Sequence, residues 1–141
     1  MIVDSNVLIY AINRRSPKHV LARQFLRKEY HNVVISHQNI LESIRVLTHP
    51  TFSFPLTIKN TVNAIDDLAS TFRVISPKDE TILVFHALLQ KYACTSNAIF
   101  DAYLTATALT NGVSVIATDN ERHFRIFEEI TIYNPFTRSL H

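Results

Sequence analysis

The chain has 141 residues, enough for one hydrophobic core, and we expect a single domain over residues 1–141. Hydrophobic residues make up 47% of it, which is typical of globular proteins and argues against disorder. The formal net charge of +2 gives no strong basic field, but it leaves nucleic acid open as a partner. The lone cysteine, Cys94, cannot form an internal disulfide, which fits a reducing cytosol. Because no apolar run reaches the ~18 residues of a membrane helix, and Asp4 interrupts the first apolar residues, we expect a cytoplasmic protein without a membrane segment or signal peptide.

The first part of the chain predicts a strand followed by two helices. Met1–Val3 is a short apolar run, and Asp4–Asn6 offers side chains that favour a helix cap before Val7–Ile12. Ser16–Pro17 is a second helix start, with a capping residue before a proline, and that helix should run over 18–30. Its inward residues are expected to be Leu21, Phe25 and Leu26.

A second strand–helix unit follows. Val33–Ile35 predicts a buried strand, and Ser36 caps a helix that runs to about residue 47. Glu42 lies off the apolar stripe of that helix, and Thr48–Pro55 is a loop broken by two prolines that holds two phenylalanines. The stripe expected to be buried consists of Ile40, Ile44 and Leu47.

The middle of the chain predicts two more helices around a third strand. Thr57 caps an amphipathic helix, and Arg73–Ile75 is a short strand. Ser76–Pro77 begins a helix that runs to about Tyr92. Near the end of the chain, Ile130–Tyr133 predicts an alternating edge strand. The residues expected inside the first of these helices are Ile58, Val62, Ile65 and Leu68.

The stretch from Ile99 to Phe124 carries two acids and predicts a helix, a tight turn, a strand and a short acidic loop. Gly112, the only glycine in the chain, stands where a helix C-terminus favours a left-handed residue. Val113–Ala117 is a β-branched run typical of a strand buried on both faces. A short connection packs helix and strand antiparallel, so Asp101 in the first helical turn and Asp119 after the strand should lie at the same edge.

Strands and helices alternate throughout, and no Asn-Gly hairpin signal separates two strands. This pattern predicts a three-layer α/β/α fold with a mostly parallel sheet of four to five strands. In such folds ligands bind beyond the carboxyl ends of the strands, where the strand order reverses. We expect the strands that end at Asp4 and Asp119 to be neighbours at this point.

Four acids should converge there: Asp4, Glu42, Asp101 and Asp119. Without a cation they would repel one another, and some would be forced to protonate. Oxygen ligands without cysteines or paired histidines favour Mg²⁺ or Mn²⁺ over zinc. A water activated by such an ion could attack a phosphodiester.

Each acid also has a simpler explanation. Asp4 could cap the first helix, and Glu42 could pair with Arg45 on the helix surface for only ~0.2–0.5 kcal/mol. Asp101 is favoured near a helix N-terminus whatever its function, and Asp119 could be an ordinary turn residue. The placement of all four at one predicted edge is what favours a site.

Several short motifs stand in order along the chain, namely Asp4-Ser5-Asn6-Val7-Leu8, Glu42 with Arg45, Arg45-Val46-Leu47-Thr48-His49-Pro50, Pro55-Leu56, Asp101-Ala102, and Thr118-Asp119-Asn120 with Phe124. This set resembles the PIN-domain nucleases, and within them the VapC-type toxins of bacterial toxin–antitoxin modules. The resemblance covers nearly the whole chain. It implies a PIN-like fold and a Mg²⁺- or Mn²⁺-dependent endoribonuclease that hydrolyses structured RNA such as tRNA or rRNA. It also implies a homodimer, and inhibition by a small partner protein, the cognate antitoxin, that inserts a segment into the acidic groove.

The resemblance assigns roles to residues as well. Asp4, Glu42, Asp101 and Asp119 match the catalytic, metal-binding acids of the family. The polar residues expected to orient those acids are Asn6, Thr118 and Ser5. Apart from the resemblance, the residues themselves suggest further contacts. The cations expected to contact RNA phosphates, with a solvated helix face as the alternative, are Arg14, Arg15, Lys18 and Arg45. Phe52 and Phe54 could stack on bases or close an apolar surface, and His123 could touch substrate.

Other functions compete with this one. A phosphatase of the haloacid dehalogenase kind needs a second aspartate two residues after the first, where this chain has Asn6. A receiver domain needs a late lysine, but no lysine follows Lys91, and a dinucleotide-binding domain needs a glycine-rich turn. A non-catalytic RNA-binding or protein-interaction module with the same fold remains as the alternative, and it would tolerate loss of the acids.

Overall fold

The computed structural model describes residues 1–137, so the last four residues of the predicted domain, 138–141, lie outside the described residues. The strands are β1 (Ile2–Val3), β2 (Val34–Ser36), β3 (Arg73–Ile75), β4 (Val115–Ala117) and β5 (Thr131–Tyr133). The helices are α1 (Ser5–Ile12), α2 (His19–Lys28), α3 (His37–Thr48), α4 (Ile58–Thr71), α5 (Thr81–Tyr92), α6 (Ala98–Thr110) and α7 (Glu121–Phe124). Within residues 1–137, no helix is long and apolar enough to cross a membrane.

The strands form one parallel sheet in the order β3-β2-β1-β4-β5. The chain builds outward from β1 to β2 and β3, and then returns across the sheet to β4 on the other side of β1. The strand order therefore reverses between β1 and β4, where Val3 is paired with Ala117. This confirms the predicted neighbourhood of the two strands that precede Asp4 and Asp119.

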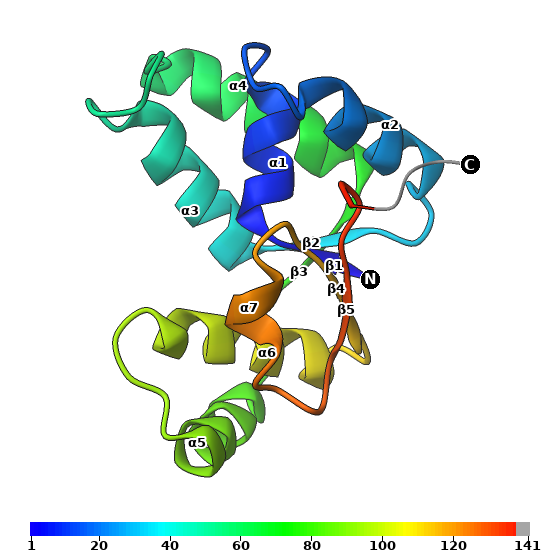
Figure 1. The fold of residues 1–141 in the computed structure, drawn as a ribbon, viewed down its shortest axis with the longest axis vertical. Helices are drawn as coiled ribbons and strands as arrows, with labels where there is room; N and C mark the ends of the chain where they lie inside the picture. Colours follow the sequence, from blue (N-terminus) through cyan, green and yellow to red (C-terminus); the bar gives the residue numbers. More distant parts are fainter. Residues whose placement is uncertain (138–141) are drawn as a thin grey trace.

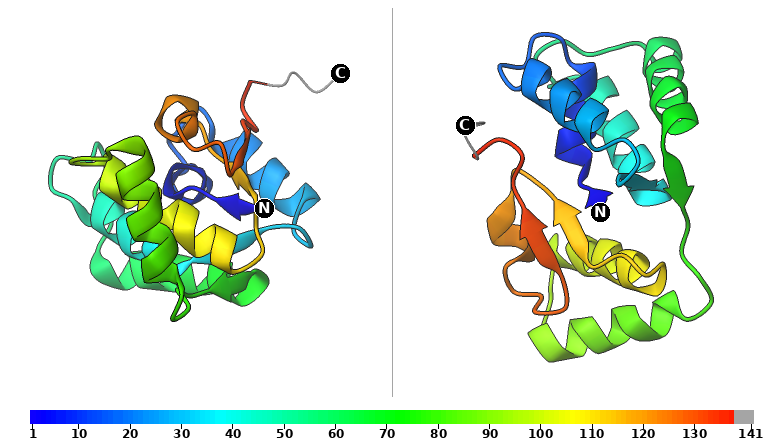
Figure 2. Two further views of the ribbon diagram at one scale, coloured as in Figure 1. Left: turned by 90° about the horizontal axis from the view of Figure 1, so that it is seen from below. Right: turned by 90° about the vertical axis from the view of Figure 1, so that its right-hand side faces the viewer.

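The central strands β1, β2 and β4 are largely buried on both faces, whereas the outer strands β3 and β5 are mostly exposed or half-buried. Alternate residues of the central strands pack into two separate cores. Ile2, Val34 and Ile116 face a core shared with α5, α6 and α7. Val3 and Ile35 face the other core, which α1, α2 and α4 complete. Figures 1 and 2 show the result, with α1 to α4 on one side of the sheet and α5 to α7 on the other. The three-layer α/β/α architecture predicted from the sequence is confirmed.

Two helices bury a different face from the one that their apolar residues predict. In α4, Ile58 and Val62 are exposed, with 61% and 38% of their surface accessible, while Thr61 and Ile65 face inward. Thr61 can be buried because its hydroxyl donates to the carbonyl of Thr57 at 2.9 Å. In α2, Leu21 is likewise exposed, and the helix buries a small residue, Ala22, beside its two predicted core residues.

The helix α3 packs mainly through polar residues. Asn39 and Ser43 are fully buried together with Leu47, whereas Ile40 and Ile44 are only half-buried. The predicted cap is present, because the Ser36 hydroxyl accepts from the backbone N–H of Asn39 and the Asn39 side chain accepts in return from that of Ser36. This capping box fixes the direction in which α3 leaves the sheet.

Several boundaries differ from the sequence prediction, and one turn agrees with it. Ser16–Pro17 does not begin α2, which starts at His19 after Lys18 and has no side-chain cap. Ser76–Pro77 does not begin α5, which starts at Thr81 after a turn in which the Thr81 hydroxyl accepts from the N–H of Lys78 at 2.8 Å. The predicted acidic loop after Asp119 contains the short helix α7. At the end of α6, Gly112 has φ of +73°, the left-handed conformation that its position predicts.

Candidate active site

Asp4 stands at the carboxyl end of β1 and is nearly buried, with 8% of its surface exposed. Its Oδ1 accepts from the backbone N–H of Ser5 at 2.7 Å, which makes it the cap of α1. Its Oδ2 accepts from the Thr118 hydroxyl at 2.7 Å and from the Asn6 amide at 2.9 Å. Capping and a role in a site are therefore compatible, because the cap fixes the carboxylate at the edge of the sheet.

Burial raises the pKa of Asp4, and the nearby carboxylate of Glu42 raises it further. Hydrogen bonds from Thr118 and Ser5 oppose this rise, because they stabilise the charged form. Thr118 is itself fully buried, and its hydroxyl also accepts from the Asn6 amide at 3.2 Å. The polar residues predicted to orient the acids thus contact Asp4 directly.

Asp119 follows β4 and is held from two sides. Its backbone N–H donates to the Asn6 side chain at 3.3 Å, which links it to the start of α1. Its Oδ2 accepts from the Tyr10 hydroxyl at 2.9 Å and forms an ion pair with the Lys18 ammonium. Burial and the Asp119 carboxylate raise the pKa of Tyr10 to about 12, so the phenol stays protonated and donates.

Asp101 lies in the first turn of α6, as the sequence predicts. Burial raises its pKa from 3.8 to about 6, and the carboxylates of Asp4 and Glu42 add to the rise. The imidazole of His123 opposes it from α7, where Nδ1 lies 3.4 Å from Asp101 Oδ2. The pKa of Asp101 therefore depends on two acids from other parts of the fold, Asp4 after β1 and Glu42 on α3.

Glu42 reaches this edge from α3 through polar contacts rather than through an ion pair. The Ser5 hydroxyl donates to Glu42 Oε2 at 2.8 Å and lies 3.3 Å from Asp4 Oδ1, so it joins the two acids. The Gln38 amide donates to Glu42 Oε1 at 3.0 Å and to the backbone carbonyl of Phe100 at 2.9 Å. Gln38 thereby ties the acid on α3 to the start of α6.

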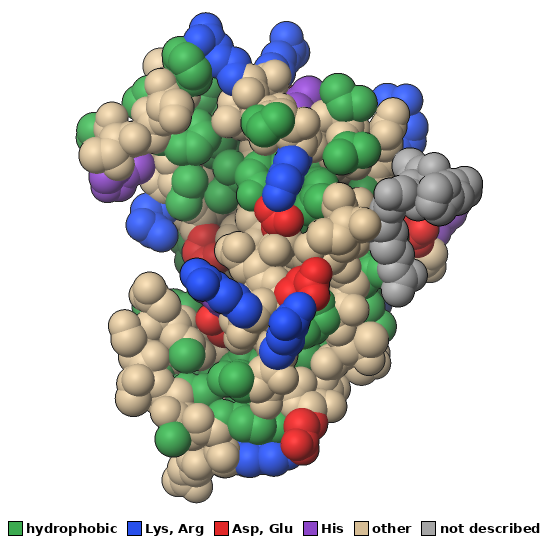
Figure 3. Space-filling view, in the orientation of Figure 1, with side chains coloured by type: hydrophobic (Ala, Val, Ile, Leu, Met, Phe, Trp, Pro, Cys, Tyr) green, Lys and Arg blue, Asp and Glu red, His purple; other side chains and the backbone are tan. Residues whose placement is uncertain are grey.

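The four predicted acids therefore gather at one edge of the sheet, but they are not equally free. Asp119 is neutralised by Lys18, while Asp4, Glu42 and Asp101 depend on hydrogen bonds and on His123. In residues 1–137, no three His, Cys, Asp or Glu side chains are arranged to ligate one ion together. The donor chemistry nevertheless fits a hard divalent cation, because all four groups offer oxygen and two carry a raised pKa. Figure 3 shows acidic side chains in the waist between the two helical layers, with lysine and arginine side chains beside them.

The four cations predicted to contact RNA have different surroundings. Lys18 is the one placed on a site carboxylate within residues 1–137. The Arg15 guanidinium stacks over the Phe54 ring, 3.5 Å from its centroid, which gives both residues a partner in the free protein. Arg14 borders a groove between α1, α2 and α4, and Arg45 is exposed on α3.

Two residues of the site escaped the sequence analysis. Tyr10 lies one helical turn after Asn6, and this spacing of four residues on α1 is the signal that could have identified it. Gln38 is likewise four residues before Glu42 on α3. Tyr10 donates a hydrogen bond to Asp119, and Gln38 donates one to Glu42. In both cases the spacing of four residues places the side chain on the helix face that points to the site.

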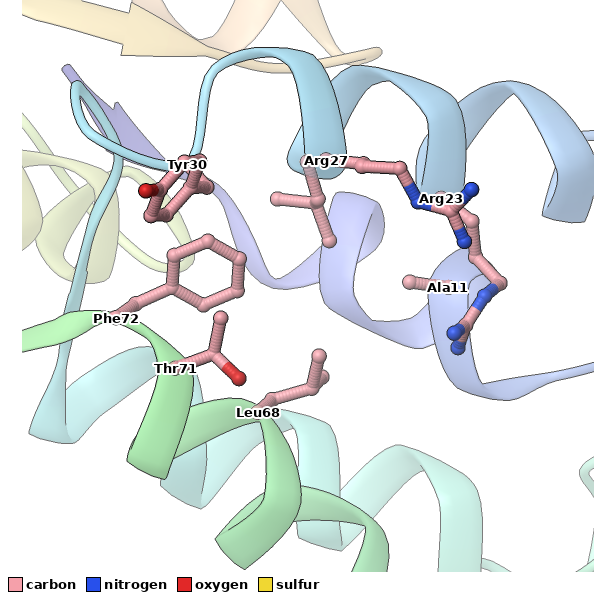
Figure 4. Close-up of a pocket in the computed structure, with 8 residues that line it drawn as sticks. Ala11, Arg23, Arg27, Tyr30, Leu68, Thr71 and Phe72 are labelled. Carbon is pink, nitrogen blue, oxygen red and sulfur yellow. The ribbon is translucent and has the colours of Figure 1, made fainter.

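A partly open pocket lies elsewhere on the molecule. It has a volume of about 240 Å³ and sits between α1, α2 and α4, bordered by Tyr30 and Phe72 and by two arginines, Arg23 and Arg27 (Figure 4). None of the four site acids lines it. This pocket is therefore separate from the candidate site.

Comparison with solved structures finds the same fold in toxin–antitoxin proteins. VapBC2 from Rickettsia felis, bound to a DNA fragment from its promoter, is 15% identical over 94% of this chain and 96% of that one, with a TM-score of 0.71. A toxin–antitoxin complex from Klebsiella pneumoniae is 21% identical over 96% and 97%, with a TM-score of 0.70. VapC20 from Mycobacterium tuberculosis, described as a toxin that cleaves the sarcin-ricin loop, is 17% identical over 92% and 97%, with a TM-score of 0.68.

Because the sequence identities are this low, the similarity to these structures shows only that the fold is shared. A comparison with curated protein sequences finds no match. The sequence model of one family, described as the PIN domain, matches residues 1–129, a range that contains all the site residues described above. The chain belongs to the PIN-domain family.

Proposed function

We propose that this chain is a metal-dependent endoribonuclease and the toxin of a toxin–antitoxin pair, with Mg²⁺ or Mn²⁺ as its cofactor. The observation that carries the proposal is the charge at the sheet edge. Asp101 has a pKa raised to about 6 because it is buried close to Asp4 and Glu42, and a divalent cation would relieve that repulsion. Membership of the PIN-domain family and the shared fold with toxins support the same conclusion.

Asp4, Glu42, Asp101 and Asp119 would form the metal site. When bound, a divalent cation supplies a Lewis acid for the phosphate and activates a water for attack. The chain itself keeps the acids in place. Thr118 and Asn6 fix Asp4, and the remaining contacts that fix the other acids come from Ser5, Gln38, Tyr10 and Lys18.

The antitoxin would bind in the groove between α1, α2 and α4. This groove encloses about 790 Å³ and shares Ala11, Arg23, Leu68 and Thr71 with the smaller pocket of Figure 4. Its lining mixes apolar side chains with two arginines, Arg14 and Arg23, and one acid, Asp67, so that its cations outnumber its acids. Such a lining suits an amphipathic partner segment that carries acids. An antitoxin is proposed as the partner because solved structures that share the fold are toxin–antitoxin complexes.

We further propose a homodimer formed through α3, α5 and the start of α6. Large apolar side chains are exposed there, notably Leu41, Leu83 and Phe100, with 68%, 69% and 58% of their surface accessible. Gln38 joins α3 to Phe100, so Leu41 and Phe100 stand on elements that are fixed to each other. A second copy would cover this apolar surface.

Cleavage of total RNA by the purified protein in Mn²⁺ tests the proposed activity. The protein should cleave, EDTA should stop it, and Asp101→Asn should lower the rate by ~100-fold or more. Asp66→Asn is the matched control, because Asp66 is an exposed acid on α4 and is not one of the four site acids. Equal cleavage by Asp101→Asn would place the activity outside this site. A protein that neither cleaves RNA nor binds Mn²⁺ would instead be a non-catalytic module.

A further inference from the structure

Lys18 lies beside the candidate metal site, where one carboxylate and two aromatic rings surround its ammonium group. Its ammonium pairs with Oδ2 of Asp119 and lies 5.5 Å from the centre of the Tyr10 ring and 5.3 Å from that of Phe136. The two rings meet edge to face, with centroids 5.4 Å apart. Two aromatic faces and one carboxylate therefore surround a single positive charge.

The backbone around Lys18 is fixed by the turn between α1 and α2. The N–H of Lys18 donates to the Ser16 hydroxyl at 3.2 Å, and its carbonyl accepts from the N–H of Ala22 at 2.9 Å. The ring of His19 makes a hydrogen bond to the backbone carbonyl of Tyr10 at 2.9 Å, which fastens this turn to α1. Lys18 is thus directed at Asp119 by local structure and by its aromatic neighbours together.

The carboxylates fall into two groups because of this contact. On one side, Asp4, Glu42 and Asp101 repel one another and have no lysine or arginine partner among residues 1–137. On the other side, Lys18 and Tyr10 both contact Oδ2 of Asp119 and leave Oδ1 facing neither of them. One divalent cation could bind the three acids of the first group. A second cation placed beside Asp119 would be repelled by the positive charge of Lys18.

We infer that the Lys18 ammonium takes the place of a second divalent cation, so that this site binds one ion. The inference rests on the proposed metal-dependent function. In two-ion nuclease sites the two cations stabilise the attacking and leaving oxygens of the phosphate. Here one of those positive charges is a side chain of the protein.

Counting bound Mn²⁺ tests the inference without any measurement of activity. Equilibrium dialysis and electron paramagnetic resonance should find one Mn²⁺ per chain in the wild-type protein. Lys18→Met and Lys18→Gln remove the charge, so they should double this number and give the exchange-broadened signal of a manganese pair. Lys18→Arg keeps the charge and should restore one ion. Lys28→Met is the control, since Lys28 is exposed in the last turn of α2, the helix that Lys18 precedes.

Two outcomes overturn the inference and leave the proposed function standing. One is two ions in the wild-type protein, and this result does not depend on any variant folding. The other is a single ion in both neutral variants, with circular dichroism showing that they are folded. No Mn²⁺ in the wild-type protein would remove the metal site itself, and the proposed function would fail with it.

Discussion

Replacing Asp101 by asparagine should make the metal-free protein more stable. The carboxylate and the amide have nearly the same shape, but the amide has no charge that burial would strip of water or that Asp4 and Glu42 would repel. The pKa of Asp101 rises from 3.8 to about 6 on folding. One pKa unit corresponds to about 1.4 kcal/mol, so ionised Asp101 would cost the fold about 3 kcal/mol at pH 7 without solvent screening.

Screening reduces this figure. The side chain of Asp101 keeps 20% of its surface exposed. Allowing about half of the unscreened value leaves a gain of ~1–2 kcal/mol in the free energy of unfolding for Asp101→Asn at pH 7. The pH dependence has the opposite sign to that of a carboxylate in an ion pair, whose pKa falls on folding and which stabilises the protein at neutral pH. Because the folded protein binds the proton more tightly, the penalty is full above pH 6, declines as the pH falls toward 3.8, and is absent below it.

Urea denaturation in EDTA at pH 8, 7, 6 and 5 measures this difference. The gain of Asp101→Asn over the wild-type protein should be greatest at pH 7 to 8 and should shrink at pH 5. Asp66→Asn, on the exposed face of α4, should show no such trend. An Asp101→Asn protein that is less stable than wild type at pH 7, with an unchanged m-value, would refute the reasoning, because the carboxylate would then be stabilised where it lies.

Three further results are expected from the same structure. Thr118→Val removes the hydroxyl that donates to Asp4 at 2.7 Å, so urea unfolding should show a loss of ~1–3 kcal/mol in the free energy of unfolding, and titration should show weaker Mn²⁺ binding. If neither value changed, the hydroxyl would not stabilise Asp4. Gly112→Ala should cost about 1 kcal/mol through backbone strain alone, since φ is +73° and an added Cβ would meet nothing within 4 Å; equal stability would mean that the turn adapts. Mn²⁺ should raise the melting temperature of the wild-type protein but not that of Asp101→Asn, and an equal rise in both would place the ion elsewhere.

Much of the fold could be predicted because the central strands β1, β2 and β4 are largely buried and because α1, α3 and α4 begin at capping side chains that the sequence shows. Short apolar runs that alternate with helices, such as Ile2–Val3, indicate central strands of a parallel sheet, and the order of elements then brings Asp4 and Asp119 to the same edge. The position of Asp101 followed from the tight turn at Gly112, whose left-handed conformation the structure confirms.

What escaped prediction depends on packing between distant segments. The apolar stripe of α4 was visible in the sequence, but its pattern does not reveal that the helix packs through Thr61 and Ile65 and leaves Ile58 in solvent. A threonine that bonds to its own backbone is as easily buried as an apolar residue. Lys18 and Asp119 are separated by 101 positions, so no local pattern could pair them.

Anomalous diffraction from a crystal soaked in Mn²⁺ would test the central claim most directly, because it locates the ion whatever the substrate. The account predicts a single manganese peak at the edge of the sheet, ligated by carboxylate oxygens of Asp4 and Asp101, with Lys18 still on Asp119. A peak bound by other residues, or no peak at this edge at saturating Mn²⁺, would contradict it.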